Sequence, residues 1–205
     1  MGTESIEASF LSIFALISFF IFLLISKYSH RIRGGALLDK DFSKPQAFHD
    51  IPVTRSGGLA AIISLSIFFY IYYLLYAEVL YNYILISYSL FLVGFLDDLR
   101  INIKPFKRLM LMVFLLFVII YFLPIKIFNI DIPFLTSFMS SHMFSSIFIL
   151  LCFLFVINGA NLIDGFNGLL TINLIIINII LTYININNQN LEFSILLISQ
   201  IIILL

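Results

Sequence analysis

The sequence predicts an all-α integral membrane protein, a polytopic helix bundle with about seven transmembrane helices in one domain over residues 1–205. Hydrophobic residues make up 62% of the chain and charged residues only 11%, and the mean hydropathy is +1.14. These values lie far outside the range of water-soluble domains. Seven apolar segments follow one another along the chain. Their continuous apolar character favours helices over barrel strands, which alternate apolar and polar residues.

The seven apolar cores lie at residues 6–26, 57–76, 79–96, 109–123, 143–157, 168–184 and 193–205. Most are long enough for a bilayer core of about 30 Å at about 1.5 Å per helical residue. Glu4 precedes the first core, which has neither a basic start nor a small-residue cleavage site, so we expect a retained helix. The last core gives roughly 20 Å of helix, so we expect this span to be unfinished, tilted or completed by something absent from this sequence. Cys152 lies within an apolar run, where we expect it to pack.

The basic residues predict the orientation of these helices. In the seven-helix topology ten Lys and Arg residues fall on one side, and only Lys126 falls on the other. The positive-inside rule therefore places the amino terminus outside and the loops at 27–56, 97–108 and 158–167 in the cytoplasm. We expect a multi-pass protein of the cell inner (plasma) membrane. The ten residues are Lys27, Arg31, Arg33, Lys40, Lys44, Arg55, Arg100, Lys104, Lys107 and Arg108.

The stretch GFLDDLR, Gly94 to Arg100, ends the third predicted span. Asp97 and Asp98 fall at a helix carboxyl terminus, where the helix dipole is already negative and disfavours each by roughly 0.3 to 1 kcal/mol. One interpretation is an interfacial charge cluster with the nearby cations. The other is a functional pair that holds a divalent metal or acts as a base toward a phosphate.

The stretch NGANLIDGFNGL, Asn158 to Leu169, interrupts two apolar runs. Asp164 or Asn167 can cap the helix that follows, with Asp-Gly and Asn-Gly as turn residues. Capping does not explain Asn158 and Asn161. Three amides and one acid offer neutral oxygen ligands, hydrogen bonds to a base and a helix start suited to a phosphate.

The predicted cytoplasmic connection before the second span contains Pro45 and Pro52, which exclude one continuous helix. His49 can be an ordinary interfacial histidine, and the positive-inside rule by itself explains Lys44 and Arg55. Individually these residues are weak signals.

Taken together, KPQAFHDIPVTRSGG, GFLDDLR with Lys107 following, and NGANLIDGFNGL resemble the polyprenyl-phosphate N-acetylhexosamine-1-phosphate transferases of glycosyltransferase family 4. The resemblance covers most of residues 37–170. The KPQ-x-F-H and DGFNG elements are closer to the branch that uses simple UDP-N-acetylhexosamines than to the muramoyl-pentapeptide branch.

The resemblance implies transfer of N-acetylhexosamine 1-phosphate from a UDP-sugar to undecaprenyl or another polyprenyl phosphate. The reaction would release UMP, need Mg2+ and serve cell-envelope polysaccharide synthesis of the O-antigen or peptidoglycan type. The bilayer is a further expected partner, nucleic acid is not, and a homodimer stays open. The implied catalytic residues are Asp97, Asp98 and Asp164, the substrate-binding residues are Lys44, His49, Arg55, Lys107, Asn161 and Asn167, and the metal-side ligand is Asn158.

Family members continue through a G-D-x-G loop, whose Asp is the main magnesium ligand, and a His-rich loop. Neither motif occurs in these 205 residues. We therefore expect a carboxyl-terminally truncated chain with little turnover by itself. The alternatives are an inactive remnant or non-catalytic membrane partner and, more weakly, a transporter. A transporter would carry paired ionisable residues in the middle of its spans, whereas here the acids lie at the ends and Asn173, Asn178 and Gln200 suit interhelical hydrogen bonds.

Overall fold

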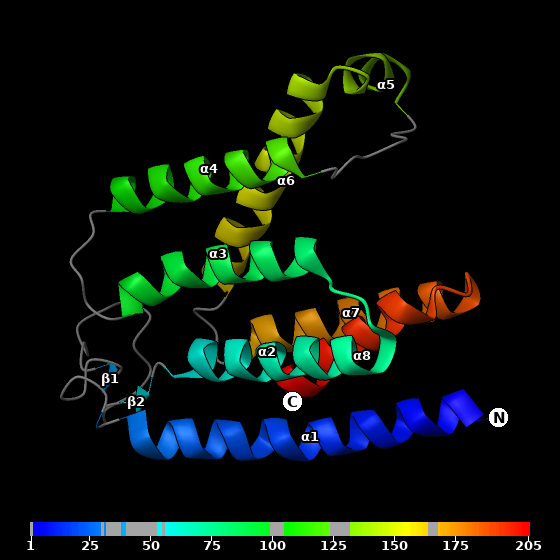
Figure 1. Ribbon diagram of the computed structural model, residues 1–205. Coiled ribbons are helices and arrows are strands. Elements are labelled where there is room, and N and C mark those ends of the chain that lie inside the picture. The colour runs from blue at the N-terminus through cyan, green and yellow to red at the C-terminus, as the bar shows by residue number, and fades with distance from the viewer. Residues whose placement is uncertain are drawn as a thin grey trace. The chain divides into compact units, whose positions relative to one another are not determined.

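The computed structural model describes residues 2–29, 31, 38–39, 53–54, 56–98, 105–123, 132–163 and 168–205. These residues form eight helices and one pair of very short strands (Figure 1). The strands β1 (Leu38–Asp39) and β2 (Val53–Thr54) pair antiparallel. The helices are α1 (Gly2–Tyr28), α2 (Gly57–Tyr76), α3 (Tyr81–Asp98), α4 (Pro105–Phe122), α5 (Pro133–Met139), α6 (His142–Ile163), α7 (Leu169–Asn187) and α8 (Leu191–Leu204).

The all-α prediction is confirmed, and each of the seven predicted apolar cores coincides with a long helix. Four helices, α1, α2, α6 and α7, are long and apolar enough to cross a membrane by length and composition. The apolar parts of α3 and α8 are shorter. Seven spans and an outside amino terminus therefore stay predictions, whereas the membrane character of the chain follows from these helices.

Two features of the helices differ from the sequence prediction. Helix α6 continues to Ile163, six residues beyond the predicted end at 157, so Asn158 and Asn161 are helical instead of lying in a loop. Asn158 fits the helix because its amide bonds to the backbone one turn earlier. The short helix α5 was not predicted. It begins with Pro133, and proline suits the first helical position because its missing N–H has no partner there anyway.

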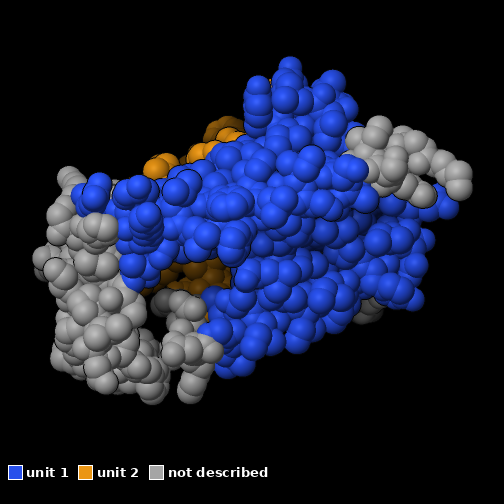
Figure 2. All heavy atoms as spheres, turned by 90° about the horizontal axis from the view of Figure 1, so that it is seen from below, with its two compact units in different colours: residues 1–79, 164–205 blue, residues 80–163 orange. Residues whose placement is uncertain are grey.

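The chain divides into two compact units, residues 1–79 with 164–205 and residues 80–163 (Figure 2). In unit 1, α8 packs against α7, α1 and α2. The contact between α1 and α2 includes a buried hydrogen bond of 3.2 Å from Ser18 Oγ to Ser64 Oγ. Small side chains of this kind let helices approach closely within a membrane. The prediction of a single domain over residues 1–205 stays a prediction.

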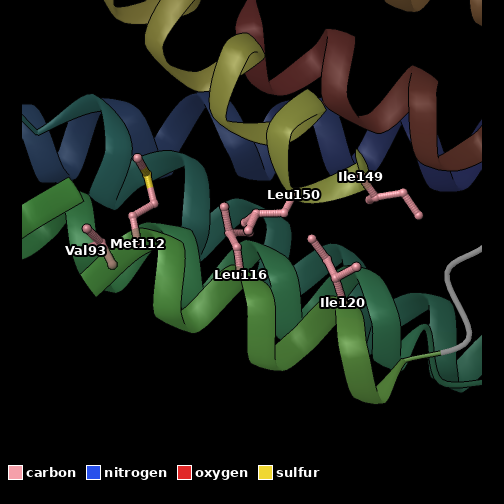
Figure 3. Close-up of a cluster of buried hydrophobic side chains, with 6 residues drawn as sticks. All are labelled: Val93, Met112, Leu116, Ile120, Ile149 and Leu150. Atoms are coloured by element: carbon pink, nitrogen blue, oxygen red, sulfur yellow. The ribbon is translucent and has the colours of Figure 1, made fainter. Parts of the chain in front are cut away.

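In unit 2, helices α3, α4 and α6 share one apolar core (Figure 3). Leu116 and Ile120 of α4 are fully buried, and they lie toward Ile149 and Leu150 of α6. Val93 of α3 lies beside Met112 of α4. Between helices in a bilayer, where lipid is as apolar as leucine, such contacts stabilise by close packing and not by removal of water.

Neighbouring leucines of α6 provide a matched test of this core. Leu150 is 7% exposed and Leu151 is 47% exposed. Leu150→Ala leaves a cavity among the three helices and should lower the free energy of unfolding by about 2 to 3 kcal/mol, whereas Leu151→Ala should change it by less than about 1 kcal/mol. Denaturant unfolding of the purified protein in lipid-detergent micelles measures both. Equal losses would contradict the described core.

Candidate functional site

Three helix ends of unit 2 lie at the same end of its core. Tyr121 of α4 and His142 of α6 are in edge-to-face ring contact, with centroids 4.8 Å apart, so the end of α4 meets the start of α6. Helices α4 and α6 are therefore antiparallel. Helix α3 also runs antiparallel to α4 (Figure 1). The carboxyl ends of α3 and α6 thus lie on the same side as the amino end of α4.

This side carries the predicted site residues that fall in unit 2. Asp97 and Asp98 are the last two residues of α3, and Asn161 is in the last turn of α6. Their backbones are described, but their side chains are not. Lys107 is the third residue of α4, and its side chain is exposed. The backbone thus places two acids, one cation and an amide-bearing residue at the ends of three separate helices of this unit.

The charges at these ends oppose the helix dipoles. The last turn of α3 contains two acids and no base, although the carboxyl end of a helix favours cations. The first turn of α4 contains Lys107 and Arg108 and no acid, although the amino end favours anions. Each such placement costs roughly 0.3 to 1 kcal/mol. The helix dipoles by themselves therefore do not explain this arrangement.

Asn158 lies one turn before Asn161 and has an exposed side chain. Its Nδ2 donates to the backbone oxygen of Leu154 at 2.8 Å. Asn173 and Asn185 of α7 make the same bond to Leu169 and Leu181, so this is a general way for an asparagine to satisfy its amide N–H in an apolar helix. The carbonyl Oδ1 of Asn158 remains as an acceptor for a ligand. The sequence predicted a hydrogen bond from Asn173 to another helix, but its Nδ2 donates to the backbone of its own helix.

The start of α7 bears on the capping interpretation of the NGANLIDGFNGL stretch. The N-cap residue is Gly168, which has a left-handed backbone with φ of 77° and forms no side-chain cap. Gly168 therefore occupies the N-cap position, and a further cap by the side chain of Asp164 or Asn167 stays a prediction. Five of the predicted site residues lie outside the described part of the chain, namely Lys44, His49, Arg55, Asp164 and Asn167.

The donor atoms on this side suit a hard cation. Carboxylate and amide oxygens are the ligands that Mg2+ prefers, and it commonly takes one or two carboxylates together with waters and substrate phosphates. Asp97, Asp98 and Asn158 supply oxygen donors of this kind. Among the side chains that the structure describes, which do not include those of Asp97 and Asp98, no three His, Cys, Asp or Glu residues cluster as a metal site.

Comparison with known proteins adds one finding. A family model described as glycosyl transferase family 4 matches residues 80–205, from the residue before α3 to the end of the chain. The match includes GFLDDLR and NGANLIDGFNGL but not the stretch with Lys44, His49 and Arg55. No curated protein and no solved structure matches the chain.

Cysteine labelling tests whether the three helix ends share one membrane face. In a Cys152→Ser background, single cysteines at the exposed positions Phe106 and Ile163 should react with an impermeant maleimide from one side of the membrane. Cysteines at Phe122 and Met143 should react from the other side, because they lie at the opposite ends of α4 and α6. Right-side-out and inverted vesicles distinguish the two sides. Labelling of positions 106 and 163 from different sides would contradict the shared face.

Proposed function

The chain belongs to glycosyl transferase family 4, and from this premise we propose that it transfers N-acetylhexosamine 1-phosphate from a UDP-sugar to a polyprenyl phosphate. Undecaprenyl phosphate is the proposed acceptor, and the product is a lipid-linked sugar diphosphate for cell-envelope polysaccharide. The observation that carries the proposal is the family match over residues 80–205, because it contains both the GFLDDLR and the NGANLIDGFNGL stretches.

The position of these stretches at helix ends suits a substrate that lies partly in lipid. A polyprenyl chain stays in the hydrocarbon, so its phosphate is held at the membrane surface, while the UDP-sugar approaches from water. A shared site must therefore lie at the ends of the spans. Asp97 and Asp98 end α3, and Lys107 lies in the first turn of α4, where the chain leaves the apolar region. We propose that this is the cytoplasmic face.

Both substrates are anionic, so the site must offset their mutual repulsion. Lys107 is exposed at the shared helix end and supplies one cation. We propose that Lys44 and Arg55 supply others, with His49 at the border of the pocket. Cations held in a site that excludes water stabilise the charge of a transferring phosphoryl group far more than they do in bulk water.

The chemical step requires one oxygen nucleophile and one leaving group. An oxygen of the lipid phosphate attacks the phosphorus that bears the sugar, the bond from that phosphorus to the bridging oxygen breaks, and UMP leaves with the electron pair. Asp97 or Asp98 accepts the proton of the lipid phosphate if it arrives protonated. We propose that Asn161, Asp164 and Asn167 hold the nucleotide. A route through a phosphosugar ester of a carboxylate uses the same residues.

Mg2+ neutralises phosphate oxygens when it is bound, and its oxygen-donor chemistry fits the side chains proposed here. Asn158 would hold it through Oδ1, because Nδ2 is already bonded to Leu154. Asp97 or Asp98 would complete the protein ligands.

Replacement of the aspartates tests the catalytic assignment. Asp97→Asn and Asp98→Asn keep the side-chain volume and remove the charge, so each should lower kcat at least about 100-fold, a size typical of the loss of a positioned acid or base. The assay measures UMP release in membranes of cells that express the full coding sequence. Asp131→Asn, on the predicted outer side, is the matched control and should retain turnover. Normal rates in both site variants would exclude the catalytic role.

Metal removal tests the proposed cofactor. Chelation of divalent cations should stop UMP release, and added Mg2+ should restore it, because the two substrate phosphates otherwise repel each other. Asn158→Leu removes the amide oxygen and should raise the Mg2+ concentration needed for half-maximal rate, whereas Asn173→Leu, which removes an amide with the same hydrogen bond pattern in α7, should not. Full activity in excess chelator would contradict a metal-dependent reaction.

A further inference from the structure

The carboxyl end of α1 gathers two cations around one exposed aromatic ring. Tyr28 is the last residue of α1 and is 44% exposed. The Nζ atom of Lys27 lies 5.9 Å from its ring centroid, and the Cζ atom of Arg31 lies 5.4 Å from the same centroid. The ring therefore draws two positive side chains to one place through cation–π attraction.

The two cations lie beside the same ring at the end of a candidate span. The side chains of Lys27 and Arg31 are both exposed. The negative end of the α1 dipole accounts for one nearby cation, but it does not account for two cations on one ring. An anion bound beside this ring would be attracted by both charges.

The location identifies the kind of anion. Tyrosine is enriched at the membrane–water interface because its ring is apolar and its hydroxyl is polar. Helix α1 is an apolar candidate span that ends at Tyr28, so we expect the three side chains to lie at headgroup depth. The predicted orientation puts this end in the cytoplasmic leaflet, which is rich in anionic lipid.

We propose that Lys27, Tyr28 and Arg31 form a binding site for the phosphate headgroup of an anionic phospholipid. The two cations bind phosphate oxygens, and the ring holds both side chains in place and lies between the lipid headgroup and its acyl chains. Because the site lies at the carboxyl end of α1, outside the residues assigned to sugar-phosphate transfer, it concerns the lipid environment of the protein and not the reaction.

Native mass spectrometry of the purified full chain, titrated with phosphatidylglycerol or phosphatidylcholine in neutral detergent, tests this site. Phosphatidylglycerol should bind more tightly. Lys27→Gln should weaken its binding about fivefold, in line with the attraction of one cation to an anionic surface. The matched control Lys40→Gln removes the same charge from the same predicted loop and should leave the affinity nearly unchanged. Equal losses in the two variants, or equal binding of the two lipids, would overturn the site.

The ring itself has a test that leaves the charge unaltered. Tyr28→Leu should lower the preference for phosphatidylglycerol severalfold, because the two cations lose the face that gathers them, while Tyr28→Phe should keep most of it. If Tyr28 had a purely structural role, Tyr28→Leu would lower the thermal stability of the protein in neutral lipid without changing its preference for phosphatidylglycerol. Glycerol 3-phosphate at the lipid concentration should not compete, and full competition would mean a soluble phosphate site and would refute the lipid assignment.

Discussion

The high free-energy cost of a charge in the hydrocarbon of a bilayer determines where this molecule can carry charged residues. A charged side chain at the centre of a span costs several kcal/mol, and an unpaired backbone group is costly as well, so the chain must cross as helices with its charges at their ends. The structure follows this constraint. Charged residues lie in the first or last turn of their helices: Lys27 in α1, Asp97 and Asp98 in α3, and Lys107 in α4. Any chemistry that needs charge is thereby confined to the membrane surfaces.

At the end of unit 2 that combines α3, α4 and α6, the charges have the wrong sign for helix stability. Acids end α3 and cations begin α4, although the dipoles of both helices favour the reverse. A cluster that stabilised only its own helices would have the opposite arrangement. The same end of α6 presents an asparagine whose N–H group is already bonded and whose oxygen remains for a ligand. These features fit a site that binds a cation and phosphates together, which is the requirement of sugar-phosphate transfer to a lipid.

Composition and the continuous apolar runs predicted the helices well, because every long apolar run must become a helix in lipid. Boundaries at polar residues were less predictable. Asn158 and Gly159 are typical of a loop, yet α6 continues through both, because the Asn158 amide bonds within the helix. Helix α5 is short and has no strong signal besides Pro133. The pairing of Lys27 and Arg31 on Tyr28 was also missed, although a tyrosine among basic residues at a span end is a signal for it. The sequence motifs predicted five of the site residues that the structure describes, namely Asp97, Asp98, Lys107, Asn158 and Asn161. The position of these residues at helix ends on one side of unit 2 depends on the packing of three helices, which the motifs do not predict.

The proposed function requires the aspartates at the end of α3 and the DGFNG stretch to border one pocket. Double electron–electron resonance between nitroxide labels on cysteines at positions 98 and 164, in a Cys152→Ser background, measures this separation directly. Pockets of about 300 to 1,000 Å³ are roughly 10 Å across, so we expect one population of distances below about 20 Å once the reach of the labels is added. A distance above about 30 Å, the thickness of the bilayer core, would contradict a shared site.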